Sequence, residues 1–264
     1  MANIQKQEQR ALSPVNQMKN LLANQGMQNL FADALKDNKD RFIASIIDLY
    51  NGDNSLQECD PKEVAMEALK AATLNLPINK NLGYAYIIPF KNNGKPTPNF
   101  QIGYKGYIQL AQRSGQYKAL NAGIMYEGME VKQDYLKGTF EIVGEQKSDK
   151  AIGYFAYFQL LNGYEKALYM SKEDVTNHAK RYSRAFGRDQ SPWKNQFDGM
   201  AQKTVLRRLL TKYGILSTEF QEAAKREEDL EVLRATENNA MLEMPVEEDE
   251  VIEAEEVEEV EAPF

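Results

Sequence analysis

The chain has 264 residues, 42% of them apolar, and its formal net charge is −7. This size supports one substantial core with appendages, whereas a single cysteine excludes an internal disulfide and a single histidine leaves few ligands for a metal site. We expect Cys59 to be a buried thiol and His178 a helix-surface imidazole. No apolar run approaches the about 20 residues of a membrane span, and the first residues lack a signal core, so we expect a cytoplasmic protein without membrane contact.

The net charge averages two regions of opposite sign. Residues 219–264 contain 18 acids and 3 bases, a net charge of −15, whereas residues 1–218 contain 29 bases and 21 acids, a net charge of +8. A basic body is typical of a protein that binds a polyanion. We expect the acidic tail to solubilise the chain, to compete with that ligand, or to recruit a partner.

Helix signals dominate the first part of the chain. Residues 1–12 are rich in glutamine, and we expect them to be mobile. The Ser-Pro pair at 13–14 predicts a helix start, because serine caps free N–H groups and proline fits the first helical turn. It opens a series of short helices that ends near Gly52. The Asp-Pro pair at 60–61 repeats the signal and predicts a helix to about Leu76.

From residue 84 onward the pattern favours strands. Two β-rich segments, 84–90 and 98–104, flank a loop at 91–97 and predict a hairpin. The segment that follows, YKGYIQLAQRSG at 104–115, predicts a helix from Tyr107, Ile108, Leu110 and Ala111 that ends at the Ser-Gly pair 114–115. Turn signals then divide residues 117–170 into four or five strands; they lie at Gly128, Gly138, Ser148-Asp149 and Asn162-Gly163. Because no crossover helices intervene, we predict an antiparallel meander.

Two amphipathic helices are predicted near the end of the body. Ser171 and Asp174 form a capping-box pattern that opens a helix over 171–187. One face of this helix carries a polar and basic stripe, with Lys180 beside it: Asn177, Arg181, Arg184 and Arg188. Residues 199–214 form the second helix, after a Ser-Pro start at 191–192 and a break near Gly199. Its apolar arc contains Val205, Leu206, Leu209, Leu210 and Tyr213, and its opposite arc contains Lys203, Thr204, Arg207, Arg208, Thr211 and Lys212.

No catalytic constellation emerges from the sequence. The only Gly-Lys pair, at 94–95, is followed by proline and lacks the first glycine of a phosphate-binding loop, so we expect no ATP site and no required cofactor. Acids of the body are scattered among cations, and we assign no catalytic and no metal-binding residue. A metal-dependent nuclease or strand-processing enzyme stays open as an alternative, and a passive coating protein for single strands is a third.

Cations interleaved with aromatic rings point to nucleic acid with exposed bases. Between His178 and Lys212 there are nine bases and two acids, a net charge of +7. Cations neutralise phosphates, while rings stack on unpaired bases. The structural alternative is that the rings form core and that single arginines pair with carboxylates. The candidate DNA-binding residues are Tyr104, Lys105, Tyr107, Arg113, Lys118, Lys180, Arg181, Arg184, Lys203, Arg207 and Arg208.

Three segments carry a resemblance to a known family. They are LGYAYIIPF at 82–90, FQIGYKGYIQLAQRSG at 100–115 and AQKTVLRRLLTKYG at 201–214. In this order they resemble the RecT branch of the phage single-strand annealing proteins, over residues 13–217. The resemblance implies an α+β fold with a small antiparallel sheet packed by helices. It also implies that residues 103–115 and 203–212, which match the family motifs, contact DNA.

The resemblance further implies an activity and partners. We expect an ATP-independent recombinase that coats single-stranded DNA, anneals it to a complementary strand through a duplex intermediate, and forms rings or helical filaments. A phage or prophage origin, a bacterial cytoplasm and a partner exonuclease are implied as well.

Annealing requires bases that are free to pair, so the protein should grip phosphates from one side. We hypothesise that Tyr104 or Tyr107 positions bases or sugars, and that five cations contact phosphates: Lys105, Arg181, Lys203, Arg207 and Arg208. The cationic arc of 199–214 spans about 180° at helical spacing, so Lys203 and Arg207 are expected to share one DNA path and Lys212 is the first to fall outside it.

Residues 218–264 form a separate acidic tail in this interpretation, helical to about Leu242 and disordered from Pro245. Its last residues, EVEEVEAPF, resemble the acidic Pro-Phe tip of bacterial single-strand binding proteins. The tail is therefore expected either to keep an oligomer soluble or to mimic that tip and compete for its receptors.

Overall fold

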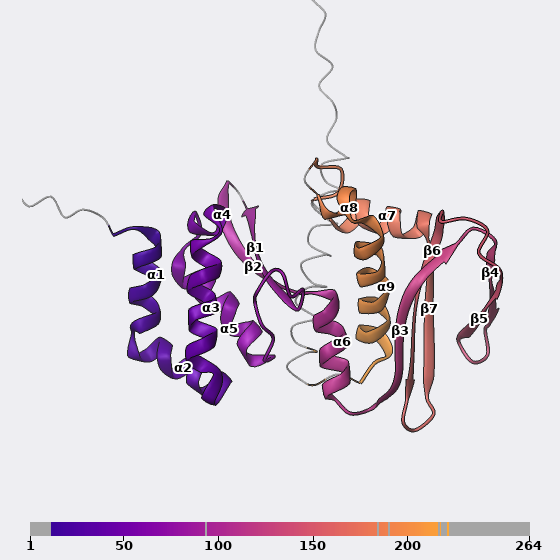
Figure 1. Cartoon of the computed structure of the whole chain (residues 1–264), viewed down its shortest axis with the longest axis horizontal. Coiled ribbons are helices and arrows are strands. Elements are labelled where there is room, and N and C mark those ends of the chain that lie inside the picture. Colours follow the sequence, from indigo (N-terminus) through magenta and orange to yellow (C-terminus); the bar gives the residue numbers. More distant parts are fainter. Residues whose placement is uncertain are drawn as a thin grey trace, which may run out of the picture.

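A computed structural model describes residues 12–92, 94–183, 185–189, 191–215, 217 and 221. Two parts lie side by side in Figure 1: a helical part with one β-hairpin, which extends to Ile102, and a second part in which helices cover an antiparallel sheet. The α+β class is therefore confirmed. The predicted mobility of residues 1–11, the candidate contact Arg184 and the predictions for the tail fall on residues outside those described.

Short helices form most of the first part. They are α1 (Pro14–Ala23), α2 (Gln25–Leu35), the 3-10 turn η1 (Lys36–Asn38), α3 (Lys39–Asn51), α4 (Asn54–Gln57) and α5 (Pro61–Thr73). Both predicted starts are confirmed, because Ser13 and Asp60 accept hydrogen bonds from backbone N–H groups of α1 and α5. Helix α5 ends before the predicted Leu76, since Asn75 adopts a left-handed conformation with φ of 49°.

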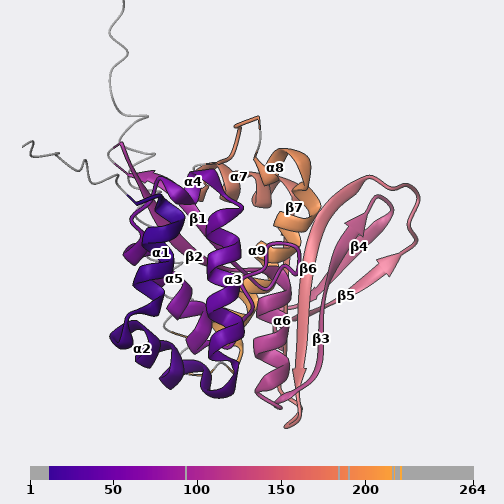
Figure 2. The same cartoon turned by 60° about the vertical axis from the view of Figure 1, so that its left-hand side comes forward.

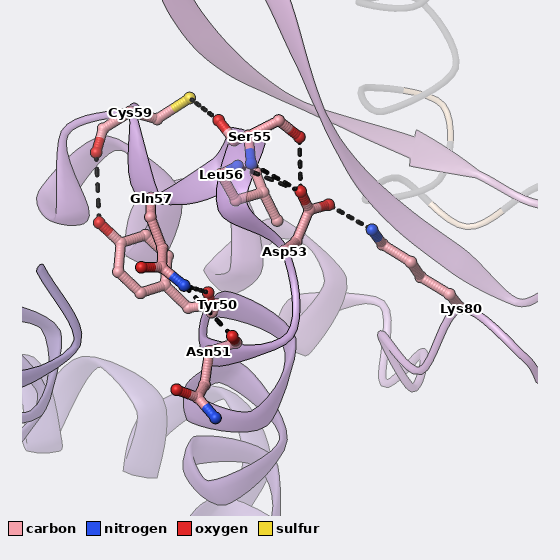
Figure 3. A network of polar contacts seen from close by, with 8 residues as sticks. All are labelled: Tyr50, Asn51, Asp53, Ser55, Leu56, Gln57, Cys59 and Lys80. Carbon is pink, nitrogen blue, oxygen red and sulfur yellow. Dashed lines mark hydrogen bonds and ion pairs between the residues drawn. The ribbon is translucent and has the colours of Figure 1, made fainter. Parts of the chain in front are cut away.

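A polar network fixes the turn between α3 and α5 (Figure 3). Asp53 accepts hydrogen bonds from two backbone N–H groups of α4 and forms an ion pair with Lys80. The hydroxyl of Tyr50 donates to the carbonyl oxygen of Cys59, at 3.4 Å. Cys59 is a buried free thiol, as predicted. The network ties the segment that precedes the hairpin to the helices, and the short helix α4 is a feature that the sequence did not predict.

The first hairpin consists of β1 (Ala85–Asn92) and β2 (Lys95–Ile102). Its pairing continues to Asn92 opposite Lys95, so the connection is shorter than the predicted loop at 91–97. The backbone N–H of Phe100 on β2 donates to the Glu67 carboxylate on α5, at 2.8 Å. This bond joins the hairpin to the helical layer.

The sheet of the second part is not a simple meander. Strands β3 (Tyr117–Tyr126), β6 (Ala151–Leu160) and β7 (Glu165–Ser171) pair antiparallel in the order β3-β6-β7, while β4 (Met129–Asp134) and β5 (Thr139–Gly144) form a separate hairpin between β3 and β6 in the chain. The ring of Phe140 on β5 meets Phe155 and Tyr169, each at 6.3 Å between centroids. The β4–β5 hairpin therefore packs against the three-stranded sheet through aromatic rings. The alternation of residues along a strand does not predict this contact.

Helices cover the opposite face of this sheet. They are α6 (Tyr104–Arg113), α7 (Lys172–Tyr182), α8 (Pro192–Asn195) and α9 (Phe197–Tyr213). Helix α9 lies between α6 and the sheet in Figure 1, and behind α6 in the turned view of Figure 2. Its residues Val205, Leu206 and Leu209 are buried. The predicted break falls at Gln196 rather than at Gly199, so α9 begins two residues earlier than expected.

Candidate nucleic-acid interface

The cations of α9 divide into two pairs. Lys203 and Arg207 are half-buried, whereas Arg208 and Lys212 are exposed together with Thr211. The members of each pair are one helical turn apart, and the two pairs lie about 140° apart around the helix axis. Thr204, which was predicted in the polar arc, is buried. Helix α9 packs against both the sheet and α6, so more of its surface is covered than its apolar residues alone indicate.

Helix α7 places a further set of charges near α9. The predicted capping box of Ser171 and Asp174 is confirmed. The helix ends at Tyr182 and Ser183 is extended, so the predicted basic stripe does not continue along one helix face to Arg188. Lys180 and Arg181 are exposed in its last turn, where cations interact favourably with the negative end of the helix dipole.

The ring of Tyr182 organises this end of α7. Its centroid lies 4.7 Å from that of His178, and the guanidinium carbon of Arg181 lies 5.4 Å from the Tyr182 centroid. A cation over a tyrosine face is held in place without being neutralised. Tyr182 therefore helps to orient the exposed guanidinium group of Arg181.

His178 links α7 to α9 electrostatically. Burial, followed by the charges of Arg208 and Arg207, lowers the pKa of His178 to about 4. Its Nδ1 atom is buried without a hydrogen-bond partner. The expectation of a helix-surface imidazole is thus only partly met, because His178 lies on α7 but is half-buried, with its ring against Tyr182. We refer to His178, Arg181, Tyr182, Arg207 and Arg208 as the α7–α9 cluster.

The two acids in the stretch 178–212 interact elsewhere. Asp189 pairs with Lys194 at 2.7 Å. Asp198 accepts a hydrogen bond at 2.5 Å from the hydroxyl of Tyr154, and burial and this carboxylate together raise the pKa of that hydroxyl. The groups that shift the pKa of His178 through their charge are both arginines. The charges that act on this imidazole are therefore positive.

Helix α6 contributes less to an interface than the sequence indicated. Tyr107 is fully buried and cannot stack on a base, so we remove it from the candidate contacts. Tyr104 is half-buried against the core, and burial raises the pKa of its hydroxyl. Lys105 is exposed in the first turn.

Arg113 lies at the far end of α6, about 12 Å from Lys105 along the helix axis, and Lys118 follows on β3. Arg113 donates to the carbonyl oxygens of Leu74 and Asn75, at 2.8 and 3.0 Å, and so caps the end of α5. Lys118 is exposed at a register shift of β3. The predicted set around α6 is therefore split between two ends of the helix.

Sequence reasoning missed a second basic position at the end of α9. The Nζ atoms of Lys166 and Lys212 lie 5.5 and 5.3 Å from the centroid of the Tyr213 ring. Tyr213 had been assigned to the apolar arc, and Lys166 belongs to β7, so only the packing of helix on sheet brings the three together. Cations held on rings thus occur near both ends of α9.

Comparisons with known proteins identify the chain. The model of the RecT family matches residues 40–258. The chain belongs to the RecT family. It is 45% identical over 233 residues to the uncharacterized protein YqaK of Bacillus subtilis strain 168, which covers 86% of this chain and 78% of YqaK. It is 31% identical over 182 residues to Protein RecT of Escherichia coli strain K12, which covers 66% of this chain and 65% of that protein.

Membership of the RecT family makes this chain a DNA-binding protein of recombination that acts by strand annealing. Its glycine-rich motif acquires a structural explanation. A Cβ atom on Gly103 would lie 2.1 Å from the carbonyl oxygen of Gly83, and one on Gly106 would lie 2.2 Å from that of Tyr84. The glycines allow the chain before β1 to cross the start of α6 at close range, so in this RecT-family chain they serve packing.

No group of three His, Cys, Asp or Glu side chains among the described residues is arranged to hold a metal ion. Within those same ranges, no helix is long and apolar enough to cross a membrane.

Proposed function

We propose that this RecT-family chain binds the phosphates of single-stranded DNA at the α7–α9 cluster and anneals complementary strands without ATP or another cofactor. The observation that carries the proposal is the combination of Arg207 and Arg208, whose charges act on His178, with the contact of His178 to Tyr182 and of Tyr182 to Arg181. Arginines brought near one another in this way raise the local positive potential, which favours an anion such as a phosphate.

The arrangement suits annealing rather than tight burial of the strand. Guanidinium groups bind phosphate oxygens through two N–H donors in a fixed geometry. Arg208 and Lys212 extend the cluster along the exposed face of α9 over about 6 Å of helix rise. A strand gripped along this line through its phosphates keeps its base edges free to pair with a complement. Lys105, Lys118 and Lys180 are exposed positions that contribute at longer range.

Self-association is part of the proposal, with a second copy of this chain as the partner. Tyr135 and Leu136 at the tip of the β4–β5 hairpin are 86% and 96% exposed. The turn that presents them is held by the Asp134 carboxylate, which accepts hydrogen bonds from the N–H groups of Leu136 and Lys137. An apolar tip that meets a different surface of the next copy makes a head-to-tail contact, which generates rings or helical filaments. Replacing both residues with serine should lower the mass of the assembly measured by light scattering.

A partner exonuclease and a host single-strand binding protein are further proposed partners. The exonuclease would supply single strands, and the terminal Pro263-Phe264 would engage receptors of the host protein. Deleting only these two residues should reduce recombination in cells while annealing by the purified chain stays unchanged. Unchanged recombination would remove the terminal residues from the proposal.

The central test mixes complementary labelled oligonucleotides with the full chain, without ATP, with and without magnesium. We expect faster annealing with intact strands. Cleavage of the strands would favour a nuclease, and protection without annealing would favour a passive coating protein.

A matched pair of variants locates the site. The double variant Arg207→Gln/Arg208→Gln should bind single strands at least about tenfold more weakly, and the slope of log affinity against log salt should fall by about 1.4. Lys70→Gln/Lys95→Gln removes the same charge from cations that pair with Glu67 and Glu63 in the first part, and should leave binding unchanged. Equal losses in both variants would mean that net charge, and not the cluster, determines binding.

A further inference from the structure

We propose that the α7–α9 cluster is also the docking surface for this chain's own acidic segment, residues 243–261, which competes with DNA for it. The inference rests on the proposed DNA-binding function of the cluster. The segment contains eleven acids and no base in nineteen residues. The stretch 178–212, which includes the cluster, has a net charge of +7. Charge complementarity therefore selects this segment as the occupant when DNA is absent.

The length of chain between the two elements permits the contact. Arg207 and Arg208 lie about 8 Å along the helix axis from the end of α9 at Tyr213. Glu243 follows Ser217 by 26 residue steps. They span about 39 Å if helical and up to about 90 Å if extended, so the segment reaches the cluster in either case. A tethered competitor acts at an effective concentration on the order of millimolar.

The strength of the competition follows from charge density. Fully extended, the segment spans about 65 Å and carries about one charge per 6 Å. One strand of B-form DNA carries one charge per about 3.4 Å, and its binding releases condensed counterions. DNA therefore displaces the segment, but binds more weakly than it would without it. A polyanion that binds the cluster more weakly than the segment does will not displace it.

The decisive variant keeps the full chain and replaces the eleven carboxylates of 243–261 with amides, Glu→Gln and Asp→Asn. At about 50 mM salt we expect it to bind a fluorescent single-stranded oligonucleotide about tenfold more tightly than the natural chain, with a steeper salt dependence, because no segment must be displaced. The difference should shrink at about 200 mM salt. Equal affinities and slopes for the two chains would overturn the inference. If neither chain binds the oligonucleotide, the proposed function itself fails.

Two controls separate charge from sequence and locate the docking surface. A variant in which residues 243–261 are present in scrambled order should bind the oligonucleotide as the natural chain does, because its charge is the same. If this variant bound as tightly as the neutralised one, docking by charge would be contradicted. In the background of Arg207→Gln/Arg208→Gln, neutralising the segment should improve binding by less than about twofold. A full tenfold gain in that background would place the segment elsewhere and overturn the proposal.

Zero-length cross-linking of the unaltered chain provides a test that does not depend on the variants. A carbodiimide joins carboxylates to lysines that they contact. We expect cross-links from residues 243–261 to Lys180, Lys203 and Lys212, and their suppression by an added oligonucleotide. Cross-links that fall equally on Lys70 and Lys80 of the first part, or that persist with bound oligonucleotide, would contradict the inference.

Discussion

The two parts of the molecule use their cations differently. In the helical part, lysines pair with carboxylates: Lys70 with Glu67, Lys80 with Asp53 and Lys95 with Glu63. In the second part Lys137, Lys150 and Lys194 also pair with carboxylates. Only there, among the described residues, do cation–ring contacts occur as well, and they join Lys166 and Lys212 to Tyr213, Lys172 to Phe197, and Arg181 to Tyr182. A carboxylate neutralises its cation, whereas a ring orients the cation and leaves its charge available.

This difference explains how an acidic protein presents a basic surface. The cations of the first part contribute to local structure, as Lys80 does in the network around Asp53. The cations around α7 and α9 lie near rings and near one another, so they raise the local potential. The net charge of a chain, or of one of its domains, is therefore a poor guide to anion binding. What each cation contacts is a better guide.

The largest effect should come from the close approach that joins the two parts. In Gly106→Ala the new Cβ atom would lie 2.2 Å from the carbonyl oxygen of Tyr84, which is backbone and cannot move aside. We expect a loss of about 3 kcal/mol or more in the free energy of unfolding, measured by urea denaturation.

Gly199→Ala is the matched control, because nothing lies within 4 Å of its added Cβ atom. An alanine in this helical position should be neutral or stabilise by up to about 1 kcal/mol. Similar losses in the two variants would show that the motif glycine has no special packing role.

The next effect concerns stability as a function of pH. The pKa of His178 is lowered from 6.5 to about 4, so the unfolded chain binds a proton more readily than the folded chain. Stability from this group is present above pH 6.5 and is lost as the pH falls from 6.5 toward 4, by about 1–3 kcal/mol. Denaturation curves between pH 7 and 4.5 should show a smaller loss for His178→Gln than for the natural chain. Parallel pH profiles would contradict the electrostatic link between α7 and α9.

A smaller effect on DNA binding should distinguish the role of the Tyr182 ring from that of the Arg181 charge. Tyr182→Leu removes the face over which Arg181 lies and keeps the net charge. We expect single-stranded DNA to bind about two- to fivefold more weakly, because a cation–ring contact is worth about 0.5–1 kcal/mol, while the salt slope stays the same. Tyr164→Leu, on the turn between β6 and β7, is the control that should leave binding unchanged. A changed salt slope in Tyr182→Leu would indicate that the ring is not acting through orientation alone.

The smallest effect is expected for an ion pair of the first part. Lys80→Gln breaks the partly exposed pair with Asp53 and should lower the free energy of unfolding by at most about 1 kcal/mol, with no change in DNA affinity. Arg208→Gln should do the reverse, leaving stability within about 0.5 kcal/mol and weakening DNA binding. If both substitutions affected binding equally, the contrast between the two parts would not hold.

Local chemistry made much of the fold predictable. Ser13, Asp60 and Ser171 cap helices where their side chains satisfy free N–H groups, and these starts are confirmed. The first hairpin and α6 also follow from turn residues and periodicity. The family was predictable from motifs, because their spacing is specific, although two glycines of the motif at 103–115, Gly103 and Gly106, serve packing in this chain.

The candidate interface was only partly predictable, because exposure depends on neighbours far away in the chain. Nothing near Tyr107 or Arg113 in the sequence reveals that one is buried and that the other caps α5. His178 and Tyr182 are four residues apart, a spacing that places two rings on one helix face, and this signal could have identified them.

The sequence by itself determined the helix starts, the strand-forming segments, the amphipathic character of α9 and the opposite charges of body and tail, because these depend on residue type and short-range spacing. The tertiary structure decided which strands pair, which cations lie together and which face of α9 remains open. Those outcomes depend on side chains brought into contact from α7, α9 and the sheet, and contact between distant segments is set by packing of the whole chain.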